Sequence, residues 1–187
     1  GDPKEKGERV ILDEKTVAAN TRALKTQLKN ILGDAKFKMV DNADWLGKVK
    51  LLPFLRDIGK HFTINDLIKR ETIKRRLDAP DDSISFTEFS YALLQGYDYF
   101  VLNEEYGVDL QVGGSDQWTN ILSGVDLIHK RLGRLVYAIG MPLVTDASGK
   151  KFGKSEGNAV WLDAKKTSPF QFYLFWLHLP DKGIENY

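Results

Sequence analysis

The sequence contains no cysteine and only three histidines among its 187 residues. Disulfide scaffolds, thiolate metal sites and cysteine nucleophiles are therefore excluded, and no metal site is expected. Positive and negative side chains nearly balance, with 27 lysines and arginines against 26 aspartates and glutamates, so overall charge gives no reason to expect a polyanion. No apolar run approaches the roughly 20 residues that cross a bilayer, and we expect no membrane partner.

The composition is that of a globular protein. Hydrophobic residues make up 42% of the chain and aromatic residues 11%, enough for one sizeable core or a core plus an insertion. The opening Gly1-Asp2-Pro3 is no secretory signal and has no initiator methionine, so we expect a truncated chain. The lack of cysteine is compatible with a reducing compartment. We expect a cytoplasmic location, with an organellar matrix as the alternative.

Helical periodicity governs the first part of the sequence. Apolar side chains recur at helical spacing over residues 13–32, and Gly33 follows as a stop. Shorter helical patterns cover residues 51–58 and 65–77. We expect residues 1–84 to form a helical connective or insertion region.

A capping-box pattern opens a long helix in the second part. Ser85 precedes an apolar run, and Glu88 stands three residues later. Along this helix Tyr91, Gln95 and Asp98 are spaced by four and three residues, so they share one face. A phenol, an amide and a carboxylate resemble a small hydrogen-bonding pocket more than the lysines and glutamates of a typical exposed face. A solvated face stays open as the alternative.

The pattern then changes to that of a strand. Residues 108–112 alternate and end in two glycines, Ser115 can cap a helix that extends to Gly133, and residues 136–144 form the next strand. Pro169 begins a last, aromatic-rich helix. A strand, a helix and a second strand make a βαβ crossover. We therefore expect an α/β fold with a parallel sheet and ligand sites at the carboxyl ends of its strands.

The end of the first predicted strand has features of a nucleotide site. Gly113 and Gly114 permit close approach of a ligand to the backbone, the helix start offers N–H groups, and Asp116 can accept from sugar hydroxyls. Alternatively, the glycines serve a tight turn and Asp116 neutralises the helix dipole.

A loop rich in lysine and glycine follows the second strand. Lys150, Lys151 and Lys154 lie within residues 149–155, where cations can follow a phosphate as charge develops on it. The P-loop pattern does not fit, because it needs four residues between its glycines and this stretch has three. A surface loop of solvated lysines is the alternative.

Taken in this order, these segments resemble the tyrosyl-tRNA synthetases of bacterial and organellar type, whose class I catalytic domain is Rossmann-like. The resemblance spans nearly the whole chain. Its most specific pieces are Phe86-Thr87-Glu88-Phe89-Ser90-Tyr91, Leu94-Gln95, Tyr97-Asp98, Gly113-Gly114-Ser115-Asp116-Gln117-Trp118, Lys151-Phe152-Gly153-Lys154-Ser155, Ala159-Val160-Trp161-Leu162-Asp163 and Lys166-Thr167-Ser168-Pro169. It implies that residues 85–187 form the second half of the catalytic domain, with a partial parallel sheet. The first strand with its His-Ile-Gly-His-type motif and the tRNA-reading domains would lie outside these residues.

The resemblance also implies a tyrosine pocket. Six residues would line it: Asp2, Tyr91, Gln95, Asp98, Gln111 and Gln117. The first three would hold the α-ammonium group of tyrosine, and Asp98 would accept a hydrogen bond from the phenolic hydroxyl. Gln111, on the predicted strand, would support the pocket, and Gln117 would lie near the substrate carboxylate.

ATP would bind beside this pocket. Gly114 and Asp116 would receive the ribose, while Lys151, Lys154 and Ser155 match the signature loop that binds the departing pyrophosphate and carries catalysis. The tyrosine carboxylate would attack the α-phosphorus of ATP, and tyrosyl would then pass to tRNA(Tyr). The nucleophile is already an anion, so the protein helps by positioning and charge stabilisation. Mg²⁺ would accompany ATP, and no side-chain cluster is built to hold it.

Two further expectations complete the comparison. The resemblance implies a homodimer with the segment around Phe86 at its interface. The family usually reads Gly-Asp-Pro-Ser-Gly near the start of this region, whereas residues 1–7 read Gly-Asp-Pro-Lys-Glu-Lys-Gly, which leaves the roles of Lys6 and Arg9 open.

A second function class stays open, namely a noncatalytic RNA-binding or structural fragment of the same fold. Such a fragment would use a basic stretch on RNA phosphates. The stretch comprises Lys69, Arg70, Lys74, Arg75 and Arg76. A solvated helix face is the usual alternative for cations at this spacing.

Overall fold

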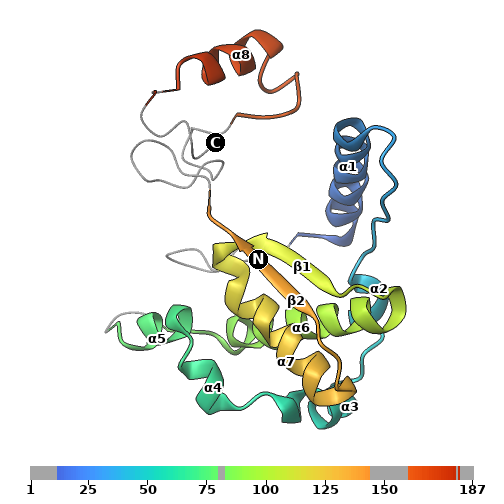
Figure 1. The fold of residues 1–187 in the computed structure, drawn as a ribbon, viewed down its shortest axis with the longest axis vertical. Coiled ribbons are helices and arrows are strands. Elements are labelled where there is room, and N and C mark those ends of the chain that lie inside the picture. The colour runs from blue at the N-terminus through green and yellow to red at the C-terminus, as the bar shows by residue number, and fades with distance from the viewer. Residues whose placement is uncertain (1–11, 80–82, 144–159, 180, 182–187) are drawn as a thin grey trace.

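The computed structural model describes residues 12–79, 83–143, 160–179 and 181, and Figure 1 shows its fold. The described part is mainly helical, with two short strands beside two long helices in the body of the molecule. The first helix, α1 (Glu14–Leu32), and the last, α8 (Pro169–Leu177), extend away from this body (Figure 1).

Helix α1 begins where the sequence predicts it. Asp13 is its N-cap, and the Asp13 side chain accepts a hydrogen bond from the Thr16 N–H at 2.7 Å. This bond satisfies one of the open donors of the first turn. Gly33 closes the helix at a φ of 55°, a conformation that favours glycine. No residue of α1 is buried.

Short helices form the segment that follows α1. They are α2 (Ala43–Leu46), α3 (Leu51–Asp57), the 3-10 helix η1 (Gly59–His61), α4 (Ile64–Ile68) and α5 (Glu71–Leu77). The helix expected over residues 51–58 is confirmed, but the single helix expected over residues 65–77 is wrong. Arg70 is extended, at φ −64° and ψ 131°, and separates α4 from α5. Its side chain reaches the body, where Nη1 donates to the Thr119 carbonyl oxygen at 3.3 Å.

The long helix α6 (Phe86–Tyr106) is capped at both ends. The Ser85 side chain accepts from the Glu88 N–H at 3.2 Å, and the Glu88 side chain accepts from the Ser85 N–H at 2.9 Å. The predicted capping box is therefore confirmed. Gly107 ends the helix in the left-handed conformation at a φ of 68°.

The two strands form a parallel pair, as predicted. Strand β1 (Leu110–Gly114) lies beside β2 (Tyr137–Met141), with Val112 opposite Ile139. Helix α7 (Trp118–Leu132) connects them, so the βαβ crossover is confirmed.

The start of α7 differs from the prediction. Ser115 does not cap this helix, because the chain first passes through a 3-10 turn, η2 (Ser115–Gln117), directly after β1. Gln117 then takes the N-cap position of α7. The strand end is thus followed by a tight turn rather than by the first turn of an α-helix.

The hydrophobic core lies where α6 packs against α7. Tyr99 is completely buried on α6, and Ile121 and Ile128 are buried on α7. Gly124 lets the two helices approach closely, because a Cβ there would lie only 2.6 Å from the Tyr99 Cβ. The Tyr99 hydroxyl donates to the Tyr137 carbonyl oxygen at 2.8 Å and so ties α6 to β2.

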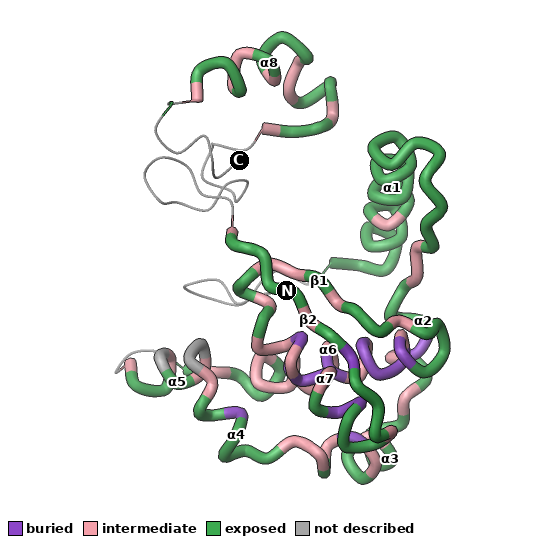
Figure 2. Tube along the Cα trace, in the orientation of Figure 1, coloured by how far each residue is buried: buried purple, intermediate pink, exposed green. Residues whose placement is uncertain are grey.

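Residues from the first part of the chain complete this core. Trp45 of α2 and Ile58, which follows α3, belong to the same hydrophobic cluster as Tyr99 and Phe100. Figure 2 shows the buried residues gathered around α6 and α7, whereas α1 and α8 are exposed or intermediate along their length. The segment that carries α2 and α3 therefore packs onto the core between α6 and α7.

Helix α8 also starts as the sequence predicts. The Ser168 side chain accepts from the Gln171 N–H at 3.2 Å, and Pro169 occupies the first helical position. No residue of α8 is buried, and its apolar Phe170 and Tyr173 are exposed. Among the described residues, no helix is long and apolar enough to span a bilayer.

Candidate functional site

Helix α6 carries the first group of predicted site residues. Tyr91, Gln95 and Asp98 follow at helical spacing on one side of α6, and all three are partly buried. A fully solvated face would leave a carboxylate exposed, so the partial burial of Asp98 favours the pocket over that alternative.

Two side chains from the segment before α3 hold the Asp98 carboxylate. Asn42 donates from Nδ2 to Oδ2 at 3.0 Å, and Trp45 donates from Nε1 to Oδ1 at 2.7 Å. Burial raises the pKa of Asp98, and the hydrogen bonds from Asn42 and Trp45 offset part of that effect. Each carboxylate oxygen has two lone pairs, so a fixed Asp98 can still accept from a further donor.

Sequence reasoning did not find Asn42 and Trp45. Their distance from Asp98 along the chain is 56 and 53 residues, which no periodicity can connect. A weak signal was present, because Trp45 is a large apolar side chain directly after the polar stretch Asp41-Asn42-Ala43-Asp44; in the structure it is only 9% exposed. A buried indole N–H needs an acceptor, and Asp98 supplies it.

The second group gathers at the carboxyl end of β1. A Cβ on Gly114 would lie 2.7 Å from Asp116 Oδ1, and a Cβ on Gly113 would lie 3.3 Å from the Gln117 Cβ. Asp116 and Gln117 therefore turn back over the two glycines, which leave room for them because they lack side chains. In open parallel sheets this edge is where ligands bind.

Gln111 is the second residue of β1, three residues before Gly114. It is in register with Ala138 of β2, and its side-chain oxygen is buried without a hydrogen-bond partner among the described residues. Leaving such an acceptor unsatisfied costs about 1–3 kcal/mol. An amide in this state suits a site that a donor on a ligand completes.

Helix α6 and the sheet form one body, so the two groups have a fixed relation. The buried Tyr99 hydroxyl donates to the Tyr137 carbonyl oxygen in the backbone of β2. The carboxylate of Asp98 and the carboxyl end of β1 therefore belong to the same packed body.

The remaining predicted site residues are Asp2, Lys151, Lys154 and Ser155, and they lie outside the described residues. The same holds for Lys6 and Arg9. Within the described ranges, no group of three or more histidine, aspartate or glutamate side chains could hold a metal ion.

The basic stretch is more engaged with the protein than its sequence suggests. Arg70 donates to a backbone carbonyl of α7, and burial lowers its pKa. Arg76 pairs with Glu88 at 3.1 Å. Lys69 and Lys74 are exposed. With two of the cations in contacts inside the protein, the structure gives less support to an RNA-binding surface than the sequence does.

Similar proteins are known in sequence and in structure. The family model described as tRNA synthetases class I (W and Y) matches residues 1–187. A tyrosine–tRNA ligase of Streptococcus mutans is 49% identical over 186 residues, which cover 97% of this chain and 44% of that protein. Tyrosine–tRNA ligase 1 of Vibrio parahaemolyticus is 48% identical over 191 residues, which cover 100% of this chain and 46% of that protein. The chain thus spans less than half the length of these curated relatives.

A solved structure shares the fold. The C-terminally truncated mitochondrial tyrosyl-tRNA synthetase of Aspergillus nidulans superimposes with a TM-score of 0.74 at 28% sequence identity. The match covers 100% of this chain and 57% of the fungal one.

Proposed function

Because the chain belongs to the family of tRNA synthetases class I (W and Y), matched over residues 1–187, we propose that it forms part of a tyrosine–tRNA ligase. Its fold is the Rossmann-like α/β fold of class I synthetase domains, helical with a small parallel sheet. In the proposed reaction ATP activates tyrosine to tyrosyl-adenylate, and tyrosyl is then transferred to tRNA(Tyr). The names of the relatives support tyrosine over tryptophan.

One observation carries the choice of amino acid. Asp98 is a partly buried carboxylate with a donor on each oxygen, held on the polar face of α6. A carboxylate fixed in this way suits a ligand hydroxyl as its third donor. The phenolic hydroxyl of tyrosine is such a donor, and phenylalanine has none.

Further contacts to the substrate amino acid would come from the polar face of α6 and from neighbouring residues. Gln95 lies about one turn and Tyr91 about two turns before Asp98, and both would take the α-ammonium group together with Asp2. The unsatisfied Gln111 oxygen supports a role as acceptor inside the pocket. Gln117, folded over the strand end, would approach the substrate carboxylate.

ATP is proposed as the second substrate. Gly114 and Asp116, which lie against each other at the end of β1, would receive its ribose. Lys151, Lys154 and Ser155 would meet the pyrophosphate as it leaves. Mg²⁺ would enter with the phosphates of ATP as part of that substrate. The division between a helical region 1–84 and a catalytic half 85–187 also stays a proposal.

The quaternary state and the location are further parts of the proposal. Phe86 is 80% exposed at the start of α6, which supports a homodimer contact there. A cytoplasmic or organellar-matrix enzyme fits the absence of cysteine.

Substitution of Asp98 tests this function. A site that hydrogen-bonds a hydroxyl rejects the analogue without it by about 10⁴-fold or more, a rule whose standard example is the tyrosyl-tRNA synthetases themselves. In the full-length gene product, Asp98→Ala should lower kcat/KM for tyrosine far more than for phenylalanine. Amino-acid-dependent exchange of pyrophosphate into ATP measures both values. Asp34→Ala, at an exposed aspartate, is the matched control. An unchanged tyrosine-to-phenylalanine ratio in Asp98→Ala would refute the assignment.

A further inference from the structure

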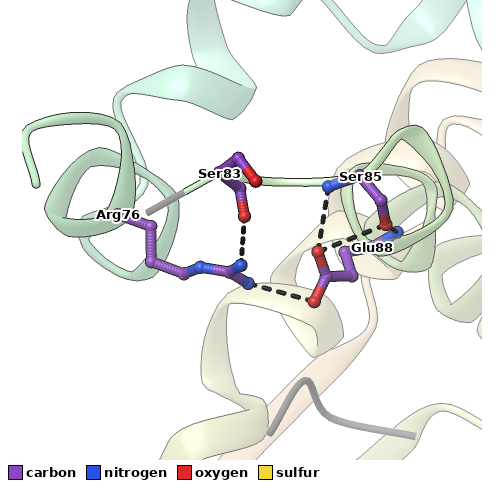
Figure 3. Close-up of polar contacts among 4 residues, drawn as sticks. All are labelled: Arg76, Ser83, Ser85 and Glu88. Atoms are coloured by element: carbon purple, nitrogen blue, oxygen red, sulfur yellow. Dashed lines mark hydrogen bonds and ion pairs between the residues drawn. The ribbon is translucent and has the colours of Figure 1, made fainter. Parts of the chain in front are cut away.

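Arg76, in the last turn of α5, joins that helix to the beginning of α6 (Figure 3). Its Nη1 donates to Glu88 Oε1 at 3.1 Å, and its Nη2 donates to the Ser83 carbonyl oxygen. The Arg76 and Glu88 side chains are only 21% and 23% exposed. One guanidinium therefore links α5 to Ser83 and to the first turn of α6.

Both oxygens of the Glu88 carboxylate are engaged in this contact. Oε1 accepts from Arg76, while Oε2 accepts from the Ser85 N–H at 2.9 Å and from the Ser85 hydroxyl at 3.2 Å. Burial by itself would raise the pKa of Glu88, but the hydrogen bonds from Ser85 and Arg76 outweigh it, and the pKa lies below its usual value. The pair is thus a full ion pair at neutral pH.

Glu88 lies on the same side of α6 as the proposed tyrosine contacts. Residues 88, 91, 95 and 98 are separated by three, four and three positions, the spacing that keeps side chains on one helix face. Tyr91 stands less than one turn after Glu88. Any shift of the first turn of α6 therefore moves Tyr91 with it.

The two ends of this face are held by different groups. Near Asp98, α6 is fixed by Asn42, Trp45 and the bond from Tyr99 to β2. At the start of α6, the capping box involves only Ser85 and Glu88. It stabilises the first turn of the helix but does not attach that turn to another element. Arg76 supplies that connection from α5.

We propose that Arg76 is a positioning residue for tyrosine binding, which fixes the first turn of α6 and thereby places Tyr91 beside the substrate ammonium group. This inference rests on the proposed function. It goes beyond that function because Arg76 touches no substrate and belongs to a different helix. A guanidinium is suited to the task, since its planar fork reaches a carboxylate and a carbonyl oxygen at once.

The proposal predicts a particular pattern of kinetic constants. In the full-length gene product, Arg76→Ala should raise KM for tyrosine about five-fold, which corresponds to about 1 kcal/mol. KM for ATP should stay unchanged, because the proposed ATP contacts, at the end of β1, in η2 and within residues 149–155, are not part of α6. The tyrosine-to-phenylalanine ratio should also stay unchanged, because Asp98 keeps its own donors.

Pyrophosphate exchange, measured with tyrosine and with phenylalanine, gives KM for tyrosine, KM for ATP and the tyrosine-to-phenylalanine ratio. Arg56→Ala is the matched control, since it removes a surface ion pair at 2.8 Å with side chains 74% and 41% exposed, and we expect it to change neither KM. Millimolar methylguanidinium should restore the tyrosine KM of Arg76→Ala. Arg76→Lys should be intermediate, because one ammonium cannot reproduce the planar fork.

The outcomes separate the two proposals. If the wild type shows no tyrosine-dependent exchange, the proposed function fails and this inference falls with it. If the wild type is active and Arg76→Ala lowers kcat while the tyrosine KM is unchanged, Arg76 is merely structural and the inference is overturned. If Arg76→Ala does not fold, Glu88→Gln takes its place, since glutamine preserves the capping acceptor and removes the charge. An unchanged tyrosine KM in Glu88→Gln would then overturn it.

Discussion

Replacing Gly124 by alanine tests the packing that places the proposed substrate-binding helix. The new Cβ would lie 2.6 Å from Cβ, 2.7 Å from Cδ1 and 3.0 Å from Cγ of Tyr99. Carbon atoms in contact prefer about 3.5–4.0 Å, so the two helices must separate by about 1 Å. Tyr99 cannot turn aside, because it is completely buried and its hydroxyl is bonded to the Tyr137 carbonyl oxygen.

Two opposing effects set the size of the change. Alanine favours the helix over glycine by about 1 kcal/mol. Overpacking a core costs about 1–3 kcal/mol, and three close contacts with a fixed ring place Gly124 at the upper end of that range. We therefore expect Gly124→Ala to lower the free energy of unfolding by about 2 kcal/mol. Because α6 moves relative to α7, KM for tyrosine should rise as well.

Urea unfolding followed by circular dichroism measures the free energy, and pyrophosphate exchange by the full-length gene product measures KM. Gly133→Ala is the control, because its φ of 64° makes alanine strained while no atom lies within 4 Å of the added Cβ. This control should cost about 1–2 kcal/mol and leave KM for tyrosine unchanged. Unchanged or increased stability of Gly124→Ala would refute the close packing of α6 on α7.

Two further predictions concern residues of the proposed site. Trp45→Phe removes a donor to Asp98 and should cost about 1.5–3 kcal/mol of stability near pH 7. Burial sets the folded-state pKa of Asp98 above its unfolded value, so ionisation of Asp98 opposes folding as pH rises, and the Trp45 N–H offsets part of that cost. The loss of stability in Trp45→Phe should therefore shrink toward about pH 4, where Asp98 is protonated to a larger extent. An equal loss of stability at pH 7 and pH 4 would contradict this role of Trp45. Lys151→Ala and Lys154→Ala should slow formation of tyrosyl-adenylate, with the tyrosine affinity nearly unchanged, because their charges meet charge that develops in the transition state. Pre-steady-state kinetics with wild-type rates would contradict this role.

Local signals explain why most helices could be predicted. Each of Asp13, Ser85 and Ser168 accepts from a backbone N–H three residues later, so the cap depends only on residues close in sequence. The alternation in β1 and the two glycines at its end likewise need no knowledge of the rest of the fold. The polar face of α6 follows from helical spacing alone.

Contacts between distant segments explain what could not be predicted. At the break between α4 and α5, the Arg70 side chain contacts a carbonyl 49 residues away on α7, a partner that the local sequence does not reveal. The helical start expected at Ser115 gives way to η2 because the chain must turn sharply out of β1. Asn42 and Trp45 have no periodic relation to Asp98, and only the folded chain brings them together.

The separation of contacting residues along the chain also suggests the order in which parts of the protein fold. Helix α6, β1, α7 and β2 are consecutive over residues 86–141, so their core contacts close short loops at a small entropic cost and suit an early folding nucleus. The donors of Asp98 come from more than fifty residues upstream and close a much longer loop. The sheet can thus form before the segment with Asn42 and Trp45 docks. The chain would acquire its sheet first and the proposed hydroxyl-binding site at Asp98 afterwards.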